Sequence, residues 1–484
     1  MRYIFARFTV ILSVFLFVGS VYAQQVTSED YARAEGFLRG YTAQLVFKSE
    51  VNPTWISTSE MWYRNTLQNG AEFVKVDAAA GKRERAFNHE RLAKSISSQL
   101  DTTYSALNLP FSTFDFSEDG KNIKFVAGGR SFTCTLSRYR CESAQIGGRA
   151  PSPLGGGRAA AFGRFRSVEV ASPDGNLEAF IRNFNLWIRD TSSKEESQLT
   201  TDGIEEFGYA TNNAGWTKGD GPVLVWSPDS KKIATFQHDG RGVGNMYLVS
   251  TATGHPELQA WKYPLPGDSL IFRIERVVID VPSRRVVRLD MPPDAHRSTI
   301  TDHIAYRGSW ADVEWSNDSS ELSFVSSSRD HKDAWLRTAN PESGVVTDIM
   351  HEHQDTFFES GIGGLNWRFL SDSNEFIWFS QRDNWGHLYL YDQKTGALKH
   401  QITKGSWNVR TIQFIDGTAR KIYFVGSGRE EGDPYFTYLY SINFDGSELK
   451  LLTPDYGTHS YDFSSDNSFF VDTYSQPDVP PVSN

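Results

Sequence analysis

A short pattern of apolar and polar positions recurs along the chain. Each copy has an apolar residue, then a turn rich in Ser, Pro, Asp, Asn and Gly, then residues that alternate between apolar and polar. Asp and Asn side chains bond to their own backbone in such turns, and alternation with a period of two is typical of a half-buried strand. The pattern therefore predicts hairpins, which begin at Phe116, Ala171, Trp226, Trp315, Leu370, Phe414 and Phe463.

The copies are regularly spaced, and the spacing predicts the architecture. Successive turn aspartates stand at positions 119, 174, 229, 318, 372, 416 and 466, so all steps but one are between 44 and 55 residues. An earlier copy is visible in Glu60-MWYR and Glu72-FVKVD, which makes eight units of three or four strands. Several strands per unit at this period are typical of a β-propeller. We expect an all-β fold, an eight-bladed β-propeller over residues 51–484.

Two units depart from the regular pattern. The step of 89 residues between the third and fourth turns is expected to be one blade with an enlarged outer hairpin, built from Leu270-IFRIERVVIDV and Arg285-VVRLD. The last unit has its inner strands from Tyr461 onward, followed by Val479-Pro-Pro-Val482, which resembles the start of a strand with nothing after it to pair with. Because an unpaired edge is a liability that proteins normally cover, we expect the last blade to be incomplete.

The first 23 residues have the features of a targeting segment. Two arginines precede a short apolar core from Thr9 to Gly19, and small residues before Gln24 fit a cleavage site. An uncleaved membrane anchor is the alternative, but a membrane span needs about 20 apolar residues. We expect a signal peptide over residues 1–23, a periplasmic or secreted protein, and no membrane span after cleavage. Residues 24–50 are expected to be partly helical, with Ser28 as N-cap.

Charge and cysteine content narrow the range of partners and cofactors. The formal net charge is −10, which disfavours nucleic acid because phosphate binding needs a basic surface. Cys134 and Cys141 flank a short apparent hairpin, so an exported protein can join them by a cross-strand disulfide; two free buried thiols are the alternative. We expect no metal and no cofactor. His351 and His353 form a His-x-His pair without a defined third ligand, and we interpret them as part of an exposed loop.

Four longer phrases are more specific than the repeat: Val225-WSPDSKKIATF, Pro256-ELQAWKYPLPGD, Phe379-SQRDNWGHLYLYD and Ile402-TKGSWNV. They resemble the propeller domain of the dipeptidyl peptidase IV branch of the prolyl oligopeptidase family, and the resemblance extends from about Tyr31 to Val482. It implies an eight-bladed propeller that caps an α/β-hydrolase domain, whose Ser, Asp and His cut after a penultimate Pro or Ala. It also implies that the propeller gates access and helps to hold the substrate's N-terminal amine, and that the protein can form a homodimer.

The chain departs from that family at the catalytic residues. A nucleophile elbow needs Gly-x-Ser-x-Gly, and no such motif occurs, so we assign no catalytic residue. Ser269, in Gly267-DSL, mimics an esterase motif but lies in a Pro/Gly-rich link within a blade. Without a nucleophile, we interpret His296, His303 and His331 as surface or blade-edge histidines.

The family's acidic amine-binding motif is also absent. In the family, a Trp is followed shortly by two or three Glu just before the strand that opens with Trp-Ser-Pro. Here Trp216 is kept, but Thr217-Lys218-Gly219-Asp220 replaces the acidic run. Because a buried ammonium needs a carboxylate partner, Trp216 and Asp220 are the substrate-binding candidates. The pair Glu205 and Glu206 lies before the expected position and does not receive this role.

Three functions are open at this point. The first is the substrate-gating and docking propeller of an exported serine peptidase, with a peptide as partner and with the hydrolase domain missing from this chain. The second is a free-standing periplasmic propeller that binds a peptide or a protein. The third is action through a hydrolase supplied by a separate subunit. We favour the first function, and we expect the chain to be catalytically silent by itself.

Overall fold

The computed structural model describes residues 26–42, 45–48, 51–100, 102–145, 169–211, 221–251, 253–295, 305–306, 309–310, 313–359 and 367–484. The chain divides into two compact units, each of which is described by itself. The first contains Met1–Arg149, Tyr461–Thr473 and Pro481–Asn484, and the second contains Ala150–Ser460 and Tyr474–Pro480. The signal peptide expected over residues 1–23 lies outside the described residues. None of the helices in the described part is long and apolar enough to cross a membrane.

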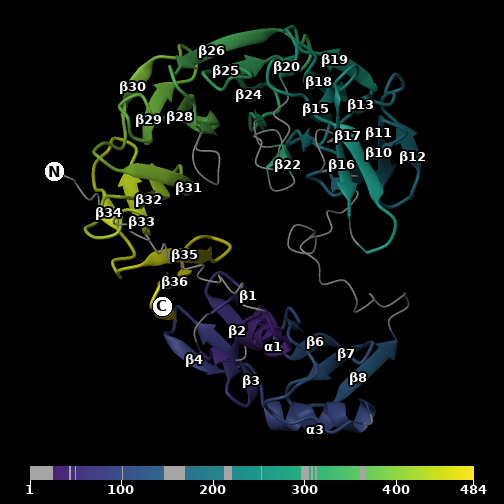
Figure 1. The fold of residues 1–484 in the computed structure, drawn as a ribbon, viewed down its shortest axis with the longest axis vertical. Coiled ribbons are helices and arrows are strands. Elements are labelled where there is room, and N and C mark those ends of the chain that lie inside the picture. Colours follow the sequence, from purple (N-terminus) through teal and green to yellow (C-terminus); the bar gives the residue numbers. More distant parts are fainter. Residues whose placement is uncertain are drawn as a thin grey trace, which may run out of the picture. The chain divides into compact units, whose positions relative to one another are not determined.

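Two four-stranded antiparallel sheets and three helices make up most of the described first unit (Figure 1). In both sheets, strands that are consecutive in the chain are neighbours in space. The elements, in chain order, are α1 (Ser28–Glu35), α2 (Arg39–Thr42), β1 (Thr54–Trp55), β2 (Glu60–Leu67), β3 (Gly70–Asp77), β4 (Lys82–Arg85), α3 (His89–Leu100), β5 (Asp115–Phe116), β6 (Asn122–Ala127), β7 (Arg130–Thr135) and β8 (Cys141–Gln145).

Helix α1 begins with a complete capping box. The Thr27 hydroxyl accepts a hydrogen bond from the Asp30 N–H at 3.2 Å, and the Asp30 carboxylate accepts one from the Thr27 N–H at 3.1 Å. These two bonds satisfy donors that a helix N-terminus leaves open. The N-cap is therefore Thr27, and Ser28, which was expected to fill this position, is the first helical residue.

Aromatic and aliphatic side chains fill the core of the first unit. Trp62 stacks on Phe114 with ring centroids 4.2 Å apart, and α3 adds Leu92 and Ile96, both fully buried. The same cluster includes the cysteines of the β7–β8 hairpin. Cys134 lies directly opposite Cys141 in the strand register, and the structure joins them by a disulfide, as the hairpin pattern predicts.

The C-terminal residues form a three-stranded sheet, ordered β35 (Thr458–Phe463), β36 (Phe470–Gln476) and β37 (Val479–Ser483). The Val479-Pro-Pro-Val482 stretch lies in a strand, as expected, and this strand, β37, pairs with β36, the strand that precedes it. Proline lacks a donor but is tolerated in an edge strand such as this one.

Hydrogen bonds within the first unit connect residues just after position 50 with residues near position 484. The Val51 N–H donates to the Ser483 hydroxyl at 3.0 Å, and the Trp55 indole N–H donates to the Asp462 carboxylate at 2.8 Å. The residue pairs are separated by 432 and 407 positions in the sequence. Residues just after position 50 therefore supply polar partners to the C-terminal sheet.

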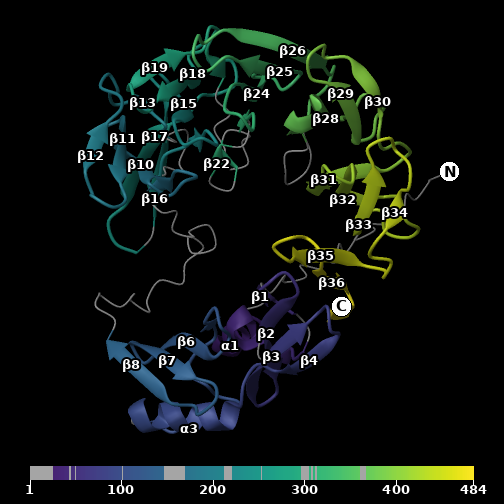
Figure 2. The same cartoon turned by 180° about the vertical axis from the view of Figure 1, so that it is seen from behind.

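Antiparallel sheets that follow one another along the chain make up the second unit (Figures 1 and 2). Four of its described sheets have four strands each. They are β9 (Val170–Ala171), β10 (Leu177–Arg182), β11 (Asn185–Asp190) and β12 (Glu196–Gln198); β23 (Val313–Trp315), β24 (Leu322–Ser327), β25 (Asp333–Ala339) and β26 (Val346–His353); β27 (Arg368–Leu370), β28 (Glu375–Ser380), β29 (His387–Asp392) and β30 (Leu398–Gln401), with the 3₁₀-helix η3 (Ser371–Ser373); and β31 (Asn408–Asp416), β32 (Lys421–Ser427), β33 (Thr437–Asn443) and β34 (Lys450–Leu451). The expected all-β class is confirmed, and the number of eight blades stays a prediction.

The enlarged unit forms one six-stranded sheet and a separate hairpin. The strands that follow Leu270 and Arg285 pair with each other within a single sheet, as expected, but the enlargement itself lies in the separate hairpin. They are part of the sheet itself, as β18 and β19, and β18 pairs with β15 over eight residues. The extra hairpin, β16 with β17, is inserted between β15 and β18. The strands are β13 (Phe207–Tyr209), β14 (Val225–Trp226), β15 (Lys232–Asp239), β16 (Asn245–Ser250), β17 (Glu257–Lys262), β18 (Arg273–Asp280), β19 (Arg285–Arg288) and β20 (Asp294–Ala295), followed by a small pair of β21 (Ala305–Tyr306) and β22 (Ser309–Trp310).

A single serine hydroxyl organises the recurring turn. In the third copy, Ser227 donates to the Asp229 carboxylate at 2.6 Å and accepts from the Lys232 N–H at 2.9 Å. These bonds close the turn over five residues and leave neither the hydroxyl nor that N–H unsatisfied. The same pair of bonds recurs at Ser117, Ser172, Ser316 and Ser464.

Neighbouring sheets of the second unit are joined through these same turns. The Asp229 N–H donates to the Ser319 hydroxyl of the next copy at 3.1 Å, and the Trp315 indole N–H donates to the Val225 carbonyl at 3.2 Å. Ser319 is buried, with a positive φ of 61°. The preceding pair of sheets has both bonds too, from Asp174 to Ser230 and from Trp226 to Val170.

Replacing Ser227 with alanine is expected to destabilise the second unit by about 1–3 kcal/mol, because the Lys232 N–H loses its hydroxyl acceptor and the Asp229 carboxylate loses a donor. The measurement is urea unfolding followed by tryptophan fluorescence. Ser250→Ala is the control, since the Ser250 hydroxyl makes no hydrogen bond to a described residue. Equal unfolding midpoints for the two variants would contradict this account of the turn.

Candidate functional site

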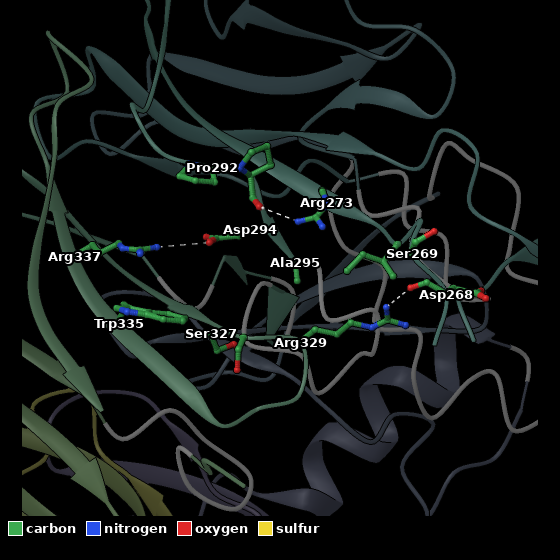
Figure 3. Close-up of a pocket in the computed structure, with 13 residues that line it drawn as sticks. Asp268, Ser269, Arg273, Pro292, Asp294, Ala295, Ser327, Arg329, Trp335 and Arg337 are labelled. Atoms are coloured by element: carbon green, nitrogen blue, oxygen red, sulfur yellow. Dashed lines mark hydrogen bonds and ion pairs between the residues drawn. The ribbon is translucent and has the colours of Figure 1, made fainter. Parts of the chain in front are cut away.

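A cavity of about 420 Å³ in the second unit is the candidate functional site (Figure 3). It lies where β18 and β20 of the six-stranded sheet meet β24 and β25 of the next sheet. Its volume falls within the range of small-ligand sites, about 300–1,000 Å³. The lining residues are Asp268, Ser269, Ile271, Arg273, Pro292, Pro293, Asp294, Ala295, Ser327, Ser328, Arg329, Trp335 and Arg337.

Two exposed arginines of the cavity bond to backbone carbonyls. Arg273 donates to the Pro293 carbonyl at 3.4 Å. Arg329 donates to the carbonyls of Leu265, at 2.8 Å, and Asp268. Within the part of the chain that the structure describes, neither guanidinium has a carboxylate within 4.0 Å. Their positive charges are therefore not neutralised by the described protein groups.

The carboxylate of Asp294 joins three strands at the wall of the cavity. Its Oδ2 accepts from Arg276 Nε of β18 at 2.7 Å and from the Ser326 hydroxyl of β24 at 2.8 Å. Its Oδ1 lies 3.8 Å from a terminal nitrogen of Arg337 in β25, which pairs with Asp348 at 2.6 Å. Figure 3 shows Arg273 and Arg337 on opposite sides of Asp294. Because Arg276 and Ser326 already satisfy it, Asp294 does little to reduce the positive charge of the cavity.

Arg276 is itself buried behind this wall, with a side chain only 2% exposed. It donates to the Val325 carbonyl at 3.0 Å, and its guanidinium lies over the ring of Phe324, 4.5 Å from the centroid. A buried cation is tolerated only with paired charges and hydrogen bonds, and the aromatic face adds a favourable interaction. Arg276 therefore fixes Asp294 and the short strand β20 at the edge of the cavity.

Trp335 forms an indole wall of the cavity and connects it to the His-x-His pair. Its ring stacks on the His351 imidazole with centroids 5.0 Å apart and an interplanar angle of 14°. His351 Nε2 and His353 Nδ1 both lie 2.8 Å from the same oxygen of Asp333. Both histidines are exposed, as expected, but the expected loop is wrong, because they lie in β26, opposite β25. Among the described residues, no group of three or more His, Cys, Asp and Glu is arranged to hold a metal ion.

The shared carboxylate changes the titration of this cluster. The hydrogen bond and charge of Asp333 raise the pKa of His353, and the two histidines, His353 first, lower the pKa of Asp333. A histidine whose pKa is raised in the folded state stabilises the fold below its ordinary value of about 6.5. That stabilisation is lost as the pH rises through the raised pKa.

Replacing Asp333 with asparagine is expected to lower the pKa of His353, because the neutral amide no longer favours the imidazolium. The measurement is an NMR titration of the histidine ring protons. Asp355→Asn is the control, since the Asp355 carboxylate lies farther from His353, at 3.6 Å, and is fully exposed. An unchanged His353 pKa in Asp333→Asn would show that the carboxylate does not hold the proton.

The substrate-binding candidates from the sequence, Trp216 and Asp220, lie outside the described residues, as do His296 and His303. Neither Glu205 nor Glu206 is assigned the amine-binding role. Glu206 forms an ion pair with the amine of Lys262 on the inserted hairpin, at 3.1 Å.

Ser269 of the Gly-Asp-Ser-Leu stretch lines the cavity, but the lining residues include no histidine. His331 instead stacks on Phe357 with ring centroids 4.7 Å apart. The described surroundings of Ser269 thus supply no imidazole base next to its hydroxyl.

The arginines of the cavity were not among the candidates from the sequence. One signal for them was present, because Arg276 stands beside Ile274 and Val277 in an apolar strand, and a buried arginine requires a partner. The partner Asp294 and the cavity arginine Arg329 come from separate segments, so only the three-dimensional arrangement brings them together.

The described strands define an all-β protein of stacked antiparallel sheets with a cationic cavity between two of them. Residues 158–481 match the family described as "Dipeptidyl peptidase IV (DPP IV) N-terminal region", and the chain belongs to that family. The matched range begins later than Tyr31, where the resemblance was expected to begin.

Curated relatives carry the names of whole peptidases. The chain is 25% identical over 334 residues to "Probable dipeptidyl peptidase 4" of Aspergillus flavus, covering 64% of this chain and 40% of that protein. It is also 25% identical over 359 residues to "Dipeptidyl-aminopeptidase B" of Aspergillus niger, covering 65% of this chain and 36% of that protein. The matched part of this chain thus covers well under half the length of these relatives.

A solved structure supports the same fold. The crystal structure of Porphyromonas gingivalis dipeptidyl peptidase 4 superposes with a TM-score of 0.58 at 20% sequence identity. The match covers 92% of this chain and 59% of that chain. At this identity, the similarity concerns the fold, and function has to be argued from the site.

Proposed function

We propose that this chain is the substrate-gating and docking propeller of an exported serine dipeptidyl peptidase that acts in proteolysis. The observation that carries the proposal is the family match over residues 158–481, together with a match that covers 40% of a relative named as a dipeptidyl peptidase. In this proposal the peptide is cut by an α/β-hydrolase domain that lies outside this sequence. Export follows from the signal peptide expected over residues 1–23.

The cavity supports a docking role because its polar groups are held in place before a ligand arrives. Arg276 and Ser326 fix Asp294, and backbone carbonyls orient the guanidinium groups of Arg273 and Arg329. Preorganised donors reduce the ordering cost of binding. In the proposed function, Trp216 and Asp220 remain the candidates for contact with the peptide amine.

The chain by itself is expected to bind peptides without cutting them. Isothermal titration with a peptide that has a free amine and a penultimate proline should show saturable binding, and incubation should release no dipeptide. A fluorophosphonate probe should label no serine, because no Gly-x-Ser-x-Gly elbow occurs. Absence of binding would overturn the docking role, whereas labelling of Ser269 would overturn the catalytic silence. Chymotrypsin serves as the positive control for the probe.

We also propose that the inserted hairpin joins two copies of the chain. Tyr247, Val249 and Leu258 share one face of this hairpin, since Val249 lies opposite Leu258 and strand side chains alternate between faces. These three side chains are 60%, 53% and 65% exposed. A two-stranded hairpin is marginal in water, and a contiguous apolar face is typical of an interaction surface.

Replacing Val249 with glutamate is expected to convert a dimer into a monomer, because the charge would be buried in the apolar contact. Sedimentation velocity measures the assembly. Gln259→Glu is the matched control, as Gln259 is exposed on the other face of the same hairpin, opposite Leu248. A monomeric wild-type chain, or a dimer that survives Val249→Glu, would count against this surface.

A further inference from the structure

We propose that the cavity between β18 and β25 binds a carboxylate of the peptide, with Arg273 and Arg329 as its ligands. The inference rests on the proposed docking of peptides and adds the chemical class that the cavity selects. The carboxylate comes either from an acidic side chain or from the C-terminus of the peptide.

The residues that line the cavity carry more positive than negative charge. Three arginines and two aspartates line it, so the lining has a surplus of positive charge. Of the aspartates, Asp294 is already bound by Arg276 and Ser326. The other, Asp268, accepts the Leu265 N–H at 2.8 Å. The cavity therefore offers more cationic donors than its own carboxylates use.

The two exposed guanidinium groups of the cavity bond to backbone carbonyls. Arg273 and Arg329 donate to neutral carbonyl oxygens of Pro293, Leu265 and Asp268. A guanidinium has five N–H donors, so each group keeps donors for a further acceptor. A carboxylate fits this geometry because it accepts two parallel bonds from one guanidinium, and charged bonds of this kind are about twice as strong as neutral ones.

The walls of the cavity favour a peptide group. Trp335 supplies an indole face, and its ring is held by the stacked His351. Pro292, Pro293 and Ala295 add apolar surface. The lining combines these apolar residues with a larger number of polar and charged ones, and the volume of about 420 Å³ lies within the range of small-ligand sites.

Three peptides distinguish the sources of the carboxylate, all with the sequence Gly-Pro-Xaa-Gly-Gly and a free amine. The first has Glu at Xaa and an amidated end, the second has Gln and a free C-terminal carboxylate, and the third has Gln and an amidated end. Isothermal titration with the full chain measures each Kd. We expect at least one of the two carboxylate peptides to bind tenfold or more tightly than the neutral one, and the stronger of the two identifies the source.

Variants locate the binding in this cavity. Arg273→Gln and Arg329→Gln should each weaken the preferred carboxylate peptide about tenfold or more and leave the neutral peptide unchanged. Arg285→Gln is the matched control, because Arg285 is also exposed and also donates to a backbone carbonyl, that of Glu342 at 3.1 Å, but lies outside the cavity. Arg329→Lys keeps the charge without the fork and should recover only part of the affinity.

The possible results separate this inference from the proposed function. If all three peptides bind equally well, or if Arg285→Gln weakens binding as much as the cavity variants, the carboxylate site is overturned while peptide docking stands. If no peptide binds, both proposals fail. The comparison of the peptides on the wild-type chain needs no variant, so a variant that fails to fold leaves the test intact.

Discussion

The serine hydroxyl of the recurring turn is the interaction on which the rest of the fold depends. In five of the copies it closes the hairpin by accepting an N–H five residues later, and it donates to an aspartate of the turn. Where Ser319 accepts the Asp229 N–H, the turn of one sheet also becomes a partner of the next. Two pairs of neighbouring sheets in the second unit are joined in this way, so the local chemistry of the turn also fixes how these sheets follow one another.

The candidate site depends on this succession because its residues come from two neighbouring sheets. Arg276 lies on β18 of one sheet, whereas Ser326 and Arg337 lie on strands of the next, and Asp294 contacts all three. The buried Arg276 requires this carboxylate, so the charge network holds the two sheets in one arrangement. The same network leaves Arg273 and Arg329 at the cavity surface, where they face solvent and are available to a ligand.

Local patterns were sufficient for the strands and insufficient for the site. The polar turn and the alternation that follows it are properties of about ten consecutive residues, so copies such as the one at Trp226 were recognisable. In the enlarged unit, β15 pairs with β18 across the inserted β16–β17 hairpin, so its partner is not the next strand along the chain, which a local pattern favours. The cavity was missed for the same reason: Arg276 and Asp294 are 18 residues apart, and Arg329 lies beyond both.

The polarity of the described cavity also bears on the expectation that Thr217–Asp220 replaces the acidic motif of the dipeptidyl peptidase IV family. A run of glutamates suits an amine, whereas here Lys218 stands within the corresponding stretch and only Asp220 is acidic. The described cavity adds guanidinium groups whose carboxylate partners are absent within 4.0 Å among the described residues. In the proposed function, both features favour the carboxylates of a peptide over its ammonium end. Because charge complementarity sets specificity more than affinity, a docking surface with this balance would differ from its relatives in which peptides it selects.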